Sequence, residues 1–234
     1  MPNTEHLSQR LYLQIADKLA ELVKNGEVKV GSRFAAEREL AADYGVSRST
    51  IREAMIALEV SGLVEIRSGS GIYALNPSRK RSPAIVIEDL PGPFEVLEAR
   101  MLLEAESVKL AAERISNEEL LQLKQLLAAM SSAVDQGDIE QAEKIDHVFH
   151  LAIIKATRNS ALLPMYEWLW EVRELSEVSK RFHSKLRSKG STPKIEEHES
   201  VCQALMQRDG EAASRAIQSH LTNVMSRLTE CSLV

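Results

Sequence analysis

The sequence predicts a mainly α-helical protein in which a winged helix-turn-helix, made of three helices plus a β-hairpin, precedes an all-α bundle of six to seven helices. Apolar residues recur at helical spacing along most of the chain. Two short extended runs lie between residues 63 and 75, on either side of a turn that contains glycine. Residues 76–92 hold three of the seven prolines and a short basic cluster. We therefore expect a winged domain at 1–75, a linker at 76–92 and a helical domain at 93–234.

The first two helices are expected near residues 8–24 and 36–43, on either side of a break at Gly31. The first of them is marked by apolar residues at helical spacing, namely Leu11, Ile15, Leu19 and Leu22. The third helix is expected to begin after the tight turn Gly45-Val46-Ser47, with the Ser47 hydroxyl as its cap, and to end at Gly62. Its expected buried face consists of Ile51, Ala54, Met55 and Leu58.

The wing of the N-terminal domain is expected directly after the third helix. Residues 63–66 and 71–75 are apolar and extended in pattern, and they flank the turn Arg67-Ser68-Gly69-Ser70. Such a pattern predicts a β-hairpin. Glycines at its tip allow the backbone to approach a second molecule closely.

The helical domain carries clear helix-start signals. Ser116 with Glu119 forms a capping box, Asp138 with Gln141 resembles one, and Thr192 precedes a proline at an expected first helical position. An apolar stripe between the first two starts, which we interpret as core, consists of Leu120, Leu123, Leu127, Met130 and Val134. Helices are expected near residues 93–114, 117–136, 139–156, 160–187, 193–208 and 210–229.

Composition argues against several classes of protein. No apolar run approaches the ~18 residues that a membrane-spanning helix needs. The N-terminus lacks the basic start and the unbroken apolar stretch of a signal peptide. The two cysteines, Cys202 and Cys231, indicate neither a disulfide framework nor a CxxC metal site. We therefore expect a cytoplasmic protein with no membrane partner.

The net charge of the chain is −5, so the protein as a whole lacks the positive charge typical of nucleic-acid binding. Any contact with DNA must therefore come from arginines placed locally. The start of the third helix combines arginines with small hydroxyl residues, which can contact phosphates without holding the helix away from the major groove. The candidate DNA contacts are Arg38, Ser47, Arg48, Ser49, Thr50 and Arg52, with Gly69 in the wing. The alternative is that these arginines lie on a solvated face or pair with Glu37, Glu39 and Glu53. Taken together, the helix-turn-helix spacing and the small-residue helix start favour DNA binding.

Four residues of the helical domain are candidates for a metal site. Asp146 and His150 are four apart and share a helix face, whereas His198 and His220 lie on the last two expected helices. If the bundle brings them together, three imidazoles and one carboxylate suit a divalent transition metal such as Zn²⁺, Ni²⁺ or Mn²⁺. An octahedral ion would keep two positions for water or for ligand oxygens. From the residues alone, the alternative is that these histidines are satisfied core residues.

Residues 36–74, AERELAADYGVSRSTIREAMIALEVSGLVEIRSGSGIYA, resemble the DNA-binding domain of GntR-type regulators over nearly its whole length. The AEREL segment, the GVSRSTIREA helix start, the ALEVSGLVE ending and the RxGxG wing occur in the family's order and spacing. The resemblance implies DNA contacts by Arg38, Arg48, Ser49, Thr50, Arg52 and Gly69. The family usually has Leu-Pro where this chain has Phe34-Ala35, a difference at the entry to the second helix that changes no expected contact.

Three segments of the helical domain, GPFEVLEARMLLEAESVKLAA, KIDHVFHLAI and EEHESVCQALMQRDGEAASRAIQSHL, resemble the FCD effector domain of the FadR subfamily. In its metal-binding members an Asp-x₃-His pair and two later histidines are ligands. The resemblance implies this role for Asp146, His150, His198 and His220. Members that bind acyl-CoA lack this set, which disfavours a fatty-acid sensor.

An anionic effector needs a cation besides the metal. The resemblance places Arg100 at the family's effector-facing arginine, and Arg173 follows two tryptophans on a helix that could face the same cavity. The alternatives are a buried ion pair of Arg100 with Glu104 or Glu98, and a solvated face that Arg173 shares with Glu174 and Glu177. His147 and His183 are expected to be surface or packing residues.

The segments ALEVSGLVEIRSGSGIY, GPFEVLEARMLLE and ATRNSALLPMYEWLWEVR also resemble hexuronate-utilisation repressors of this subfamily, which implies a sugar-acid effector that chelates the metal. The sequence thus predicts a homodimeric regulator that binds double-stranded operator DNA and is not an enzyme. Repression that the effector relieves is the commoner behaviour in the family, so we expect a repressor. Two alternatives stay open. One is a metal-dependent enzyme acting on a sugar acid, for which no additional general base is identifiable near the four ligands. The other is a regulator whose metal is purely structural.

Overall fold

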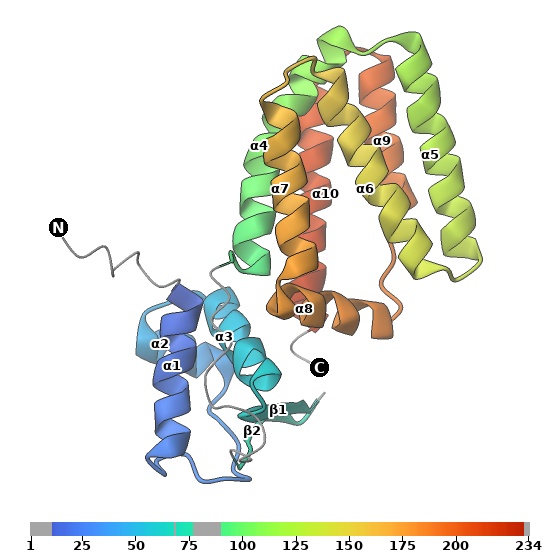
Figure 1. Cartoon of the computed structure of the whole chain (residues 1–234). Coiled ribbons are helices and arrows are strands. Elements are labelled where there is room, and N and C mark those ends of the chain that lie inside the picture. Colours follow the sequence, from blue (N-terminus) through green and yellow to red (C-terminus); the bar gives the residue numbers. More distant parts are fainter. Residues whose placement is uncertain (1–10, 68, 77–89, 232–234) are drawn as a thin grey trace, which may run out of the picture. The chain divides into compact units, whose positions relative to one another are not determined.

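The computed structural model describes residues 11–67, 69–76 and 90–231 (Figure 1). Within these residues the chain forms ten helices and one two-stranded sheet, which confirms the predicted fold class. The contacts divide the chain into two compact units. The first comprises Met1–Phe94, Leu175–Lys185 and Leu228–Val234, and the second comprises Glu95–Glu174 and Leu186–Arg227. Most of the expected linker at 76–92 lies outside the described residues.

The N-terminal helices are α1 (Leu11–Lys24), α2 (Glu37–Tyr44) and α3 (Arg48–Val60). Both α1 and α2 pack on α3. The predicted face of α3 is fully buried, and the core around it consists of Tyr12, Ile15, Leu19, Ile51, Ala54, Met55 and Leu58. The expected start of the first helix, residues 8–10, lies outside the described residues.

The turn between α2 and α3 has the predicted chemistry. Gly45 ends α2 in the left-handed region at φ 66°, a conformation that glycine adopts without steric cost, and its N–H donates to the Ala41 and Ala42 carbonyls. The Ser47 hydroxyl accepts a hydrogen bond from Thr50 N at 3.1 Å and thereby caps α3. These two residues fix the angle at which α3 leaves the turn.

The wing is a hairpin of β1 (Val64–Arg67) and β2 (Gly71–Ala74), paired antiparallel. Val64 lies opposite Ala74, and both are buried. A side chain at Gly71 would collide with the Arg33 guanidinium, which crosses the hairpin at this point. Gly71 is therefore required for the close approach of Arg33 to the wing.

The remaining helices are α4 (Pro93–Arg114), α5 (Asn117–Asp135), α6 (Ile139–Ala156), α7 (Leu162–Leu175), α8 (Glu177–Ser188), α9 (Ile195–Met206) and α10 (Gly210–Cys231). Within the second unit, α5 packs on both α6 and α9 (Figure 1). The predicted caps of α5 and α6 are present, since Ser116 and Asp138 accept hydrogen bonds from the backbones of Glu119 and Gln141. Leu123 and Met130 form the most buried part of the apolar stripe on α5.

Two helix boundaries differ from the prediction. The helix expected at 160–187 is broken, because the buried Ser176 hydroxyl accepts a hydrogen bond from Ser179 N and starts α8 as a new helix. The predicted start at Thr192-Pro193 is wrong. Helix α9 begins at Ile195, with an extended Lys194 before it whose carbonyl accepts from His198 N. Serine fits both helix interiors and caps, so apolar spacing alone did not reveal the break.

Arginine side chains tie the ends of the bundle helices together. Arg208, at φ 54° just after α9, donates to the carbonyls of Ala112 and Ile115 at the end of α4. The Ala112 carbonyl is in the last turn of α4 and the Ile115 carbonyl directly follows the helix, so the guanidinium satisfies acceptors that would otherwise need water. Arg114 donates in the same way to the Thr157 carbonyl after α6.

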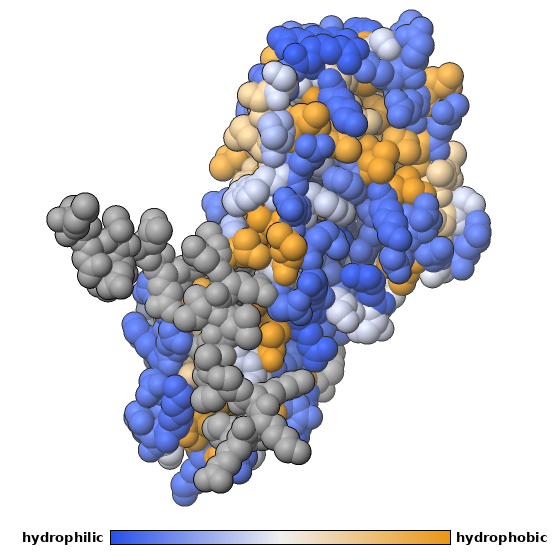
Figure 2. All heavy atoms as spheres, viewed as in Figure 1, coloured by the Kyte–Doolittle hydropathy of each residue, from blue (hydrophilic) through white to orange (hydrophobic). Residues whose placement is uncertain are grey.

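The surface of the described residues includes an open apolar groove. No helix among the described residues has the length and apolar character needed to cross a membrane. The face in Figure 2 is mostly hydrophilic, with hydrophobic residues in separate patches. On the second unit, α4 and α7 carry an open apolar groove of about 430 Å³. It is lined by Ala99, Leu103, Pro164, Met165, Trp168 and Leu169, and Leu102 beside Leu103 is 71% exposed.

Candidate metal centre and nucleic-acid interface

The start of α3 presents a cluster of hydroxyl groups. Ser47 Oγ lies 2.7 Å from Ser49 Oγ and 2.8 Å from Thr50 Oγ1. Ser47 and Arg48 are exposed, as is Arg38 on α2. A helix N-terminus with exposed hydroxyls and a neighbouring arginine suits a phosphate group. Gly69 is exposed at the hairpin tip with φ 67°.

Arg52 is placed differently from the other candidate DNA contacts. Its side chain is 1% exposed and pairs with Glu37, with Nη2 2.7 Å from Oε2 and Nε donating to Oε1 at 3.2 Å. Its Nη1 is buried without a hydrogen-bond partner. The alternative interpretation, in which an arginine pairs with Glu37, therefore describes Arg52 in this structure. The guanidinium offers nothing to DNA unless it leaves Glu37.

Two exposed arginines near the wing were not singled out from the sequence. Arg33 crosses Gly71, and Arg67 lies 4.4 Å from the centre of the Tyr73 ring while pairing with Glu65. The signal that could have found them is the presence of an arginine on each side of a predicted wing. Arg33 adds positive charge near the wing, whereas Glu65 offsets the charge of Arg67.

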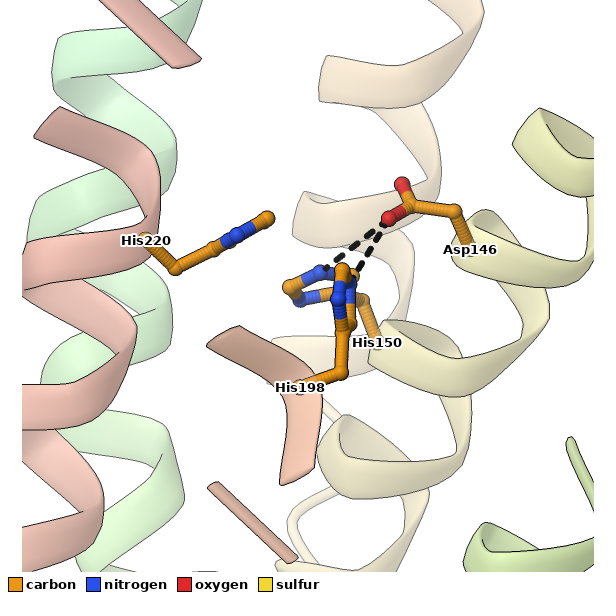
Figure 3. A group of neighbouring side chains, drawn as sticks. All are labelled: Asp146, His150, His198 and His220. Carbon is orange, nitrogen blue, oxygen red and sulfur yellow. Dashed lines mark hydrogen bonds and ion pairs between the residues drawn. The ribbon is translucent and has the colours of Figure 1, made fainter. Parts of the chain in front are cut away.

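The structure brings the four metal candidates together from three helices. Asp146 and His150 lie on α6, His198 on α9 and His220 on α10, and their side chains converge in Figure 3. One ligand atom from each lies within 4.8 Å of all the others. His198 Nε2 donates to Asp146 Oδ1 at 2.8 Å, and His150 Nε2 lies 3.9 Å from the same oxygen. All three histidines are buried.

Each of the three histidines has a second partner on the side away from this centre. His150 Nδ1 lies 2.6 Å from Glu104 Oε2, His198 Nδ1 lies 2.8 Å from the Lys194 carbonyl, and His220 Nδ1 lies 2.7 Å from Glu197 Oε2. These oxygens can only accept, so they favour a proton on each Nδ1 and leave each Nε2 for the centre. This outer set of acceptors is typical of histidines that bind metal ions.

The residues fit a metal ion on two further counts. His150 Nε2 is buried and has no hydrogen-bond partner. A metal ion that accepts the lone pair of this nitrogen would give it the partner that buried polar atoms normally have. Metal bonds from His and Asp are about 2.1 Å long, which sets opposite ligand atoms about 4.2 Å apart. The observed limit of 4.8 Å therefore needs only a small contraction.

Electrostatics keep Asp146 and His220 in metal-binding form, whereas His198 must lose a proton to bind a metal: burial opposes its charge, but the hydrogen bond to Asp146 raises its pKa. Burial opposes ionisation of Asp146, but the hydrogen bond from His198 and the neighbouring imidazoles hold its pKa well below the usual value. Glu104, against Arg100 and His150, has a pKa lowered to about 2. Burial lowers the pKa of His220 to about 4, so its ring is neutral near pH 7.

Arg100 forms the buried ion pair considered as an alternative. It is 6% exposed, and its Nε donates to Glu104 Oε1 at 2.7 Å. The same carboxylate approaches His150, so one acid connects the arginine to a metal candidate. Arg100 Nη2 is buried without a hydrogen-bond partner, which leaves one donor for another molecule.

Arg173 does not lie on a solvated face as the alternative interpretation had it, although Glu174 does lie beside it, with Oε1 3.8 Å from Arg173 Nε. Its side chain is 12% exposed, and its Nη2 lies 2.8 Å from Glu143 Oε2 on α6. It covers the Trp170 ring at 4.3 Å, and His147 stacks on the same ring at 4.0 Å between centroids. This stack agrees with a packing role for His147. Arg173 Nε is buried without a hydrogen-bond partner.

Comparison with known proteins gives two family matches. Residues 11–74 match the gntR family of bacterial regulatory proteins, and residues 95–223 match the FCD domain. The Uxu operon regulator of Haemophilus influenzae is 35% identical, over 98% of this chain and 86% of its own length. The Exu regulon transcriptional regulator of Escherichia coli K12 is 34% identical, over 92% and 83%. These relatives are named as regulators, not enzymes.

A solved structure supports the fold. The E. coli protein McbR/YncC aligns over 94% of this chain and 98% of its own, with a TM-score of 0.50 and 24% identity. At this identity the likeness concerns the fold alone.

Proposed function

Because the chain belongs to the GntR family of bacterial regulatory proteins and carries an FCD domain, we propose that this transcriptional regulator binds a small carboxylate at a metal site in its bundle. The observation that carries the proposal is the convergence of Asp146, His150, His198 and His220, each histidine with an acceptor behind it. A site prepared in this way suits Zn²⁺, Ni²⁺ or Mn²⁺.

The metal would bind the effector's oxygens as a Lewis acid. Arg100 is the proposed carboxylate partner, because its Nη2 is a buried donor without a hydrogen bond. Arg173 is the second proposed effector residue, since its Nε is also buried and free of hydrogen bonds. A sugar acid is the first candidate, because the sequence resembles hexuronate-utilisation repressors and the Uxu and Exu regulators are relatives.

The DNA-binding half of the proposal rests on the exposed start of α3. The proposed contacts are Arg38, Ser47, Arg48, Ser49 and Thr50, with Gly69 at the wing and Arg52 once it is released from Glu37. A homodimer would place two such helices on two half-sites of a double-stranded operator. The apolar groove on α4 and α7 supports a second copy as partner, because exposed apolar patches of this kind are typical of interfaces.

The test is a thermal-shift series with sugar acids on metal-loaded and chelator-treated protein. We expect one acid to raise the Tm only when the metal is present, because a ligand that binds the folded state stabilises it. His198→Ala should abolish this shift, whereas Ser200→Ala, an exposed change on the same helix, should keep it. A shift that persists without metal would contradict the proposal, and unfolding on chelation without any acid effect would favour a structural metal.

A further inference from the structure

Charged side chains that water barely reaches lie near the metal candidates: Glu143 is one turn before Asp146 on α6, and Arg100 and Arg173 both lie against the Trp170 ring. Two are positive, Arg100 and Arg173, and three are negative, Glu104, Glu143 and Asp146. Each is at most 19% exposed. Charges in such surroundings must be compensated nearby, because desolvating an unpaired charge is costly.

These side chains form two linked pairs and one remaining carboxylate. Glu104 pairs with Arg100 at 2.7 Å, and Glu143 pairs with Arg173 at 2.8 Å. Asp146 contacts only histidines in the described contacts. The other charges near the site do not change this count. Glu197, behind His220, is neutralised by its ion pair with Arg227. At the rim, Arg187 and Glu174 have opposite charge and are 41% and 62% exposed.

The sum of these charges sets the charge of the ligand. When the histidines bind a metal they are neutral, so two positive and three negative side chains leave one negative charge in excess. A divalent ion would turn this into a single positive charge in excess. One monoanion neutralises it, whereas a dianion would leave an unpaired negative charge inside the bundle.

We propose that Glu143 restricts the effector of this site to acids with a single carboxylate. The inference rests on the proposed function, and it concerns which acids the site accepts. Glu143 accepts from Arg173 Nη2 and cancels the charge of the guanidinium. The buried Nε of Arg173, which makes no hydrogen bond, then suits a hydroxyl or carbonyl oxygen better than a carboxylate. Arg100 also pairs with a glutamate, but Glu104 divides its two oxygens between Arg100 and His150. Arg100 Nη2 and the metal are therefore the groups left for a carboxylate.

The test compares acids that differ only in the number of carboxylates. D-gluconate and D-glucarate form such a pair, and D-galactonate and galactarate form a second; all four are open-chain acids. Calorimetric binding to the full-length, metal-loaded wild type in mildly alkaline buffer should favour the monoacid of a pair by about tenfold or more. Glu143→Gln removes one buried negative charge and should shift this ratio toward the diacid by about tenfold.

A matched control and a second variant keep the outcome decisive. Glu174→Gln removes the same charge from a side chain that is 62% exposed, so the monoacid preference should not change. Arg173→Gln removes one buried positive charge and should lower the affinity for diacids more than that for monoacids. It provides a second test if the Glu143→Gln protein does not fold. Metal stoichiometry is measured for every variant, so that a lost ion is not mistaken for lost selectivity.

The failures of the two proposals are distinguishable. Equal binding of monoacid and diacid by the wild type, or an unchanged ratio in Glu143→Gln, would overturn the role of Glu143 while leaving an acid-binding metal site in place. Binding of neither class by metal-loaded wild type would overturn the proposed function and this inference together.

Discussion

Glu104 and His150 lie 2.6 Å apart between Oε2 and Nδ1, and the other oxygen of the same carboxylate accepts from Arg100 Nε at 2.7 Å. One buried acid on α4 thus positions both a metal candidate and the proposed effector arginine. The Glu104–His150 approach is too poorly aligned to give the ring a hydrogen bond in this structure. A metal on Nε2 would strengthen it by making the Nδ1 proton more acidic.

Glu104→Gln should therefore lower metal affinity by about 10- to 100-fold, the usual effect of removing a partner behind a ligand histidine. Competition with a chromophoric chelator measures this constant. Glu106→Gln, an exposed change on the same helix, is the control and should leave it unchanged. Equal affinity in wild type and Glu104→Gln would show that the carboxylate serves only Arg100.

Alanine variants of Arg52 and Arg48 should affect different properties, namely the stability of the fold and the affinity for DNA. Arg52→Ala leaves Glu37 buried without its partner and should lower the free energy of unfolding by about 3 kcal/mol or more. Arg48→Ala changes an exposed side chain and should weaken operator binding without a comparable loss. Urea unfolding and a DNA-binding titration measure the two effects. An Arg52→Ala protein of wild-type stability that lost only DNA binding would place Arg52 among the direct contacts.

Cys202 should be a poorly reactive thiol. Burial raises its pKa to about 11, so almost none of it is thiolate near pH 8. The alkylation rate of the folded protein in a Cys231→Ser background should be far below that of the same protein in urea. It should rise with pH up to about 11 as the thiolate forms. Native and unfolded rates that agree would mean that the thiol is accessible.

Substitutions of Arg208 should measure how much a left-handed backbone conformation after α9 lowers the free energy of unfolding. Both Arg208→Ala and Arg208→Gly remove the hydrogen bonds to Ala112 and Ile115, but only alanine keeps a β-carbon at φ 54°. Glycine should therefore be the more stable replacement by about 0.5–1 kcal/mol. Thermal unfolding of the two variants gives the difference. A more stable alanine variant would rule out strain at this position.

The sequence predicted the local features whose chemistry is itself local. The turn at Gly45, the cap at Ser47 and the capping box at Ser116 each depend on residues a few positions apart, and the structure has all three. The break at Ser176 was missed because apolar spacing continues from α7 into α8. The residue types of the four metal candidates were visible in the sequence, but only folding shows that their ligand atoms converge.

Partners brought together by the packing of distant helices were harder to predict. The Arg173–Glu143 pair joins α7 to α6, whereas the sequence offered only neighbouring acids as partners. Glu197 behind His220 joins α9 to α10 and had no sequence signal. Glu104 was considered only as a partner of Arg100, and its second contact with His150 depends on the distance between α4 and α6.

The four candidate ligands come from α6, α9 and α10, with α7 and α8 lying between the first and the second of these helices along the chain. An ion held by this set acts as a reversible cross-link that closes a long loop, and such links reduce the freedom of the unfolded chain as well as stabilising the folded one. Metal supply would then control the lifetime of the folded bundle. A cell short of the ion would lose regulator molecules to proteolysis rather than merely leave them insensitive to effector.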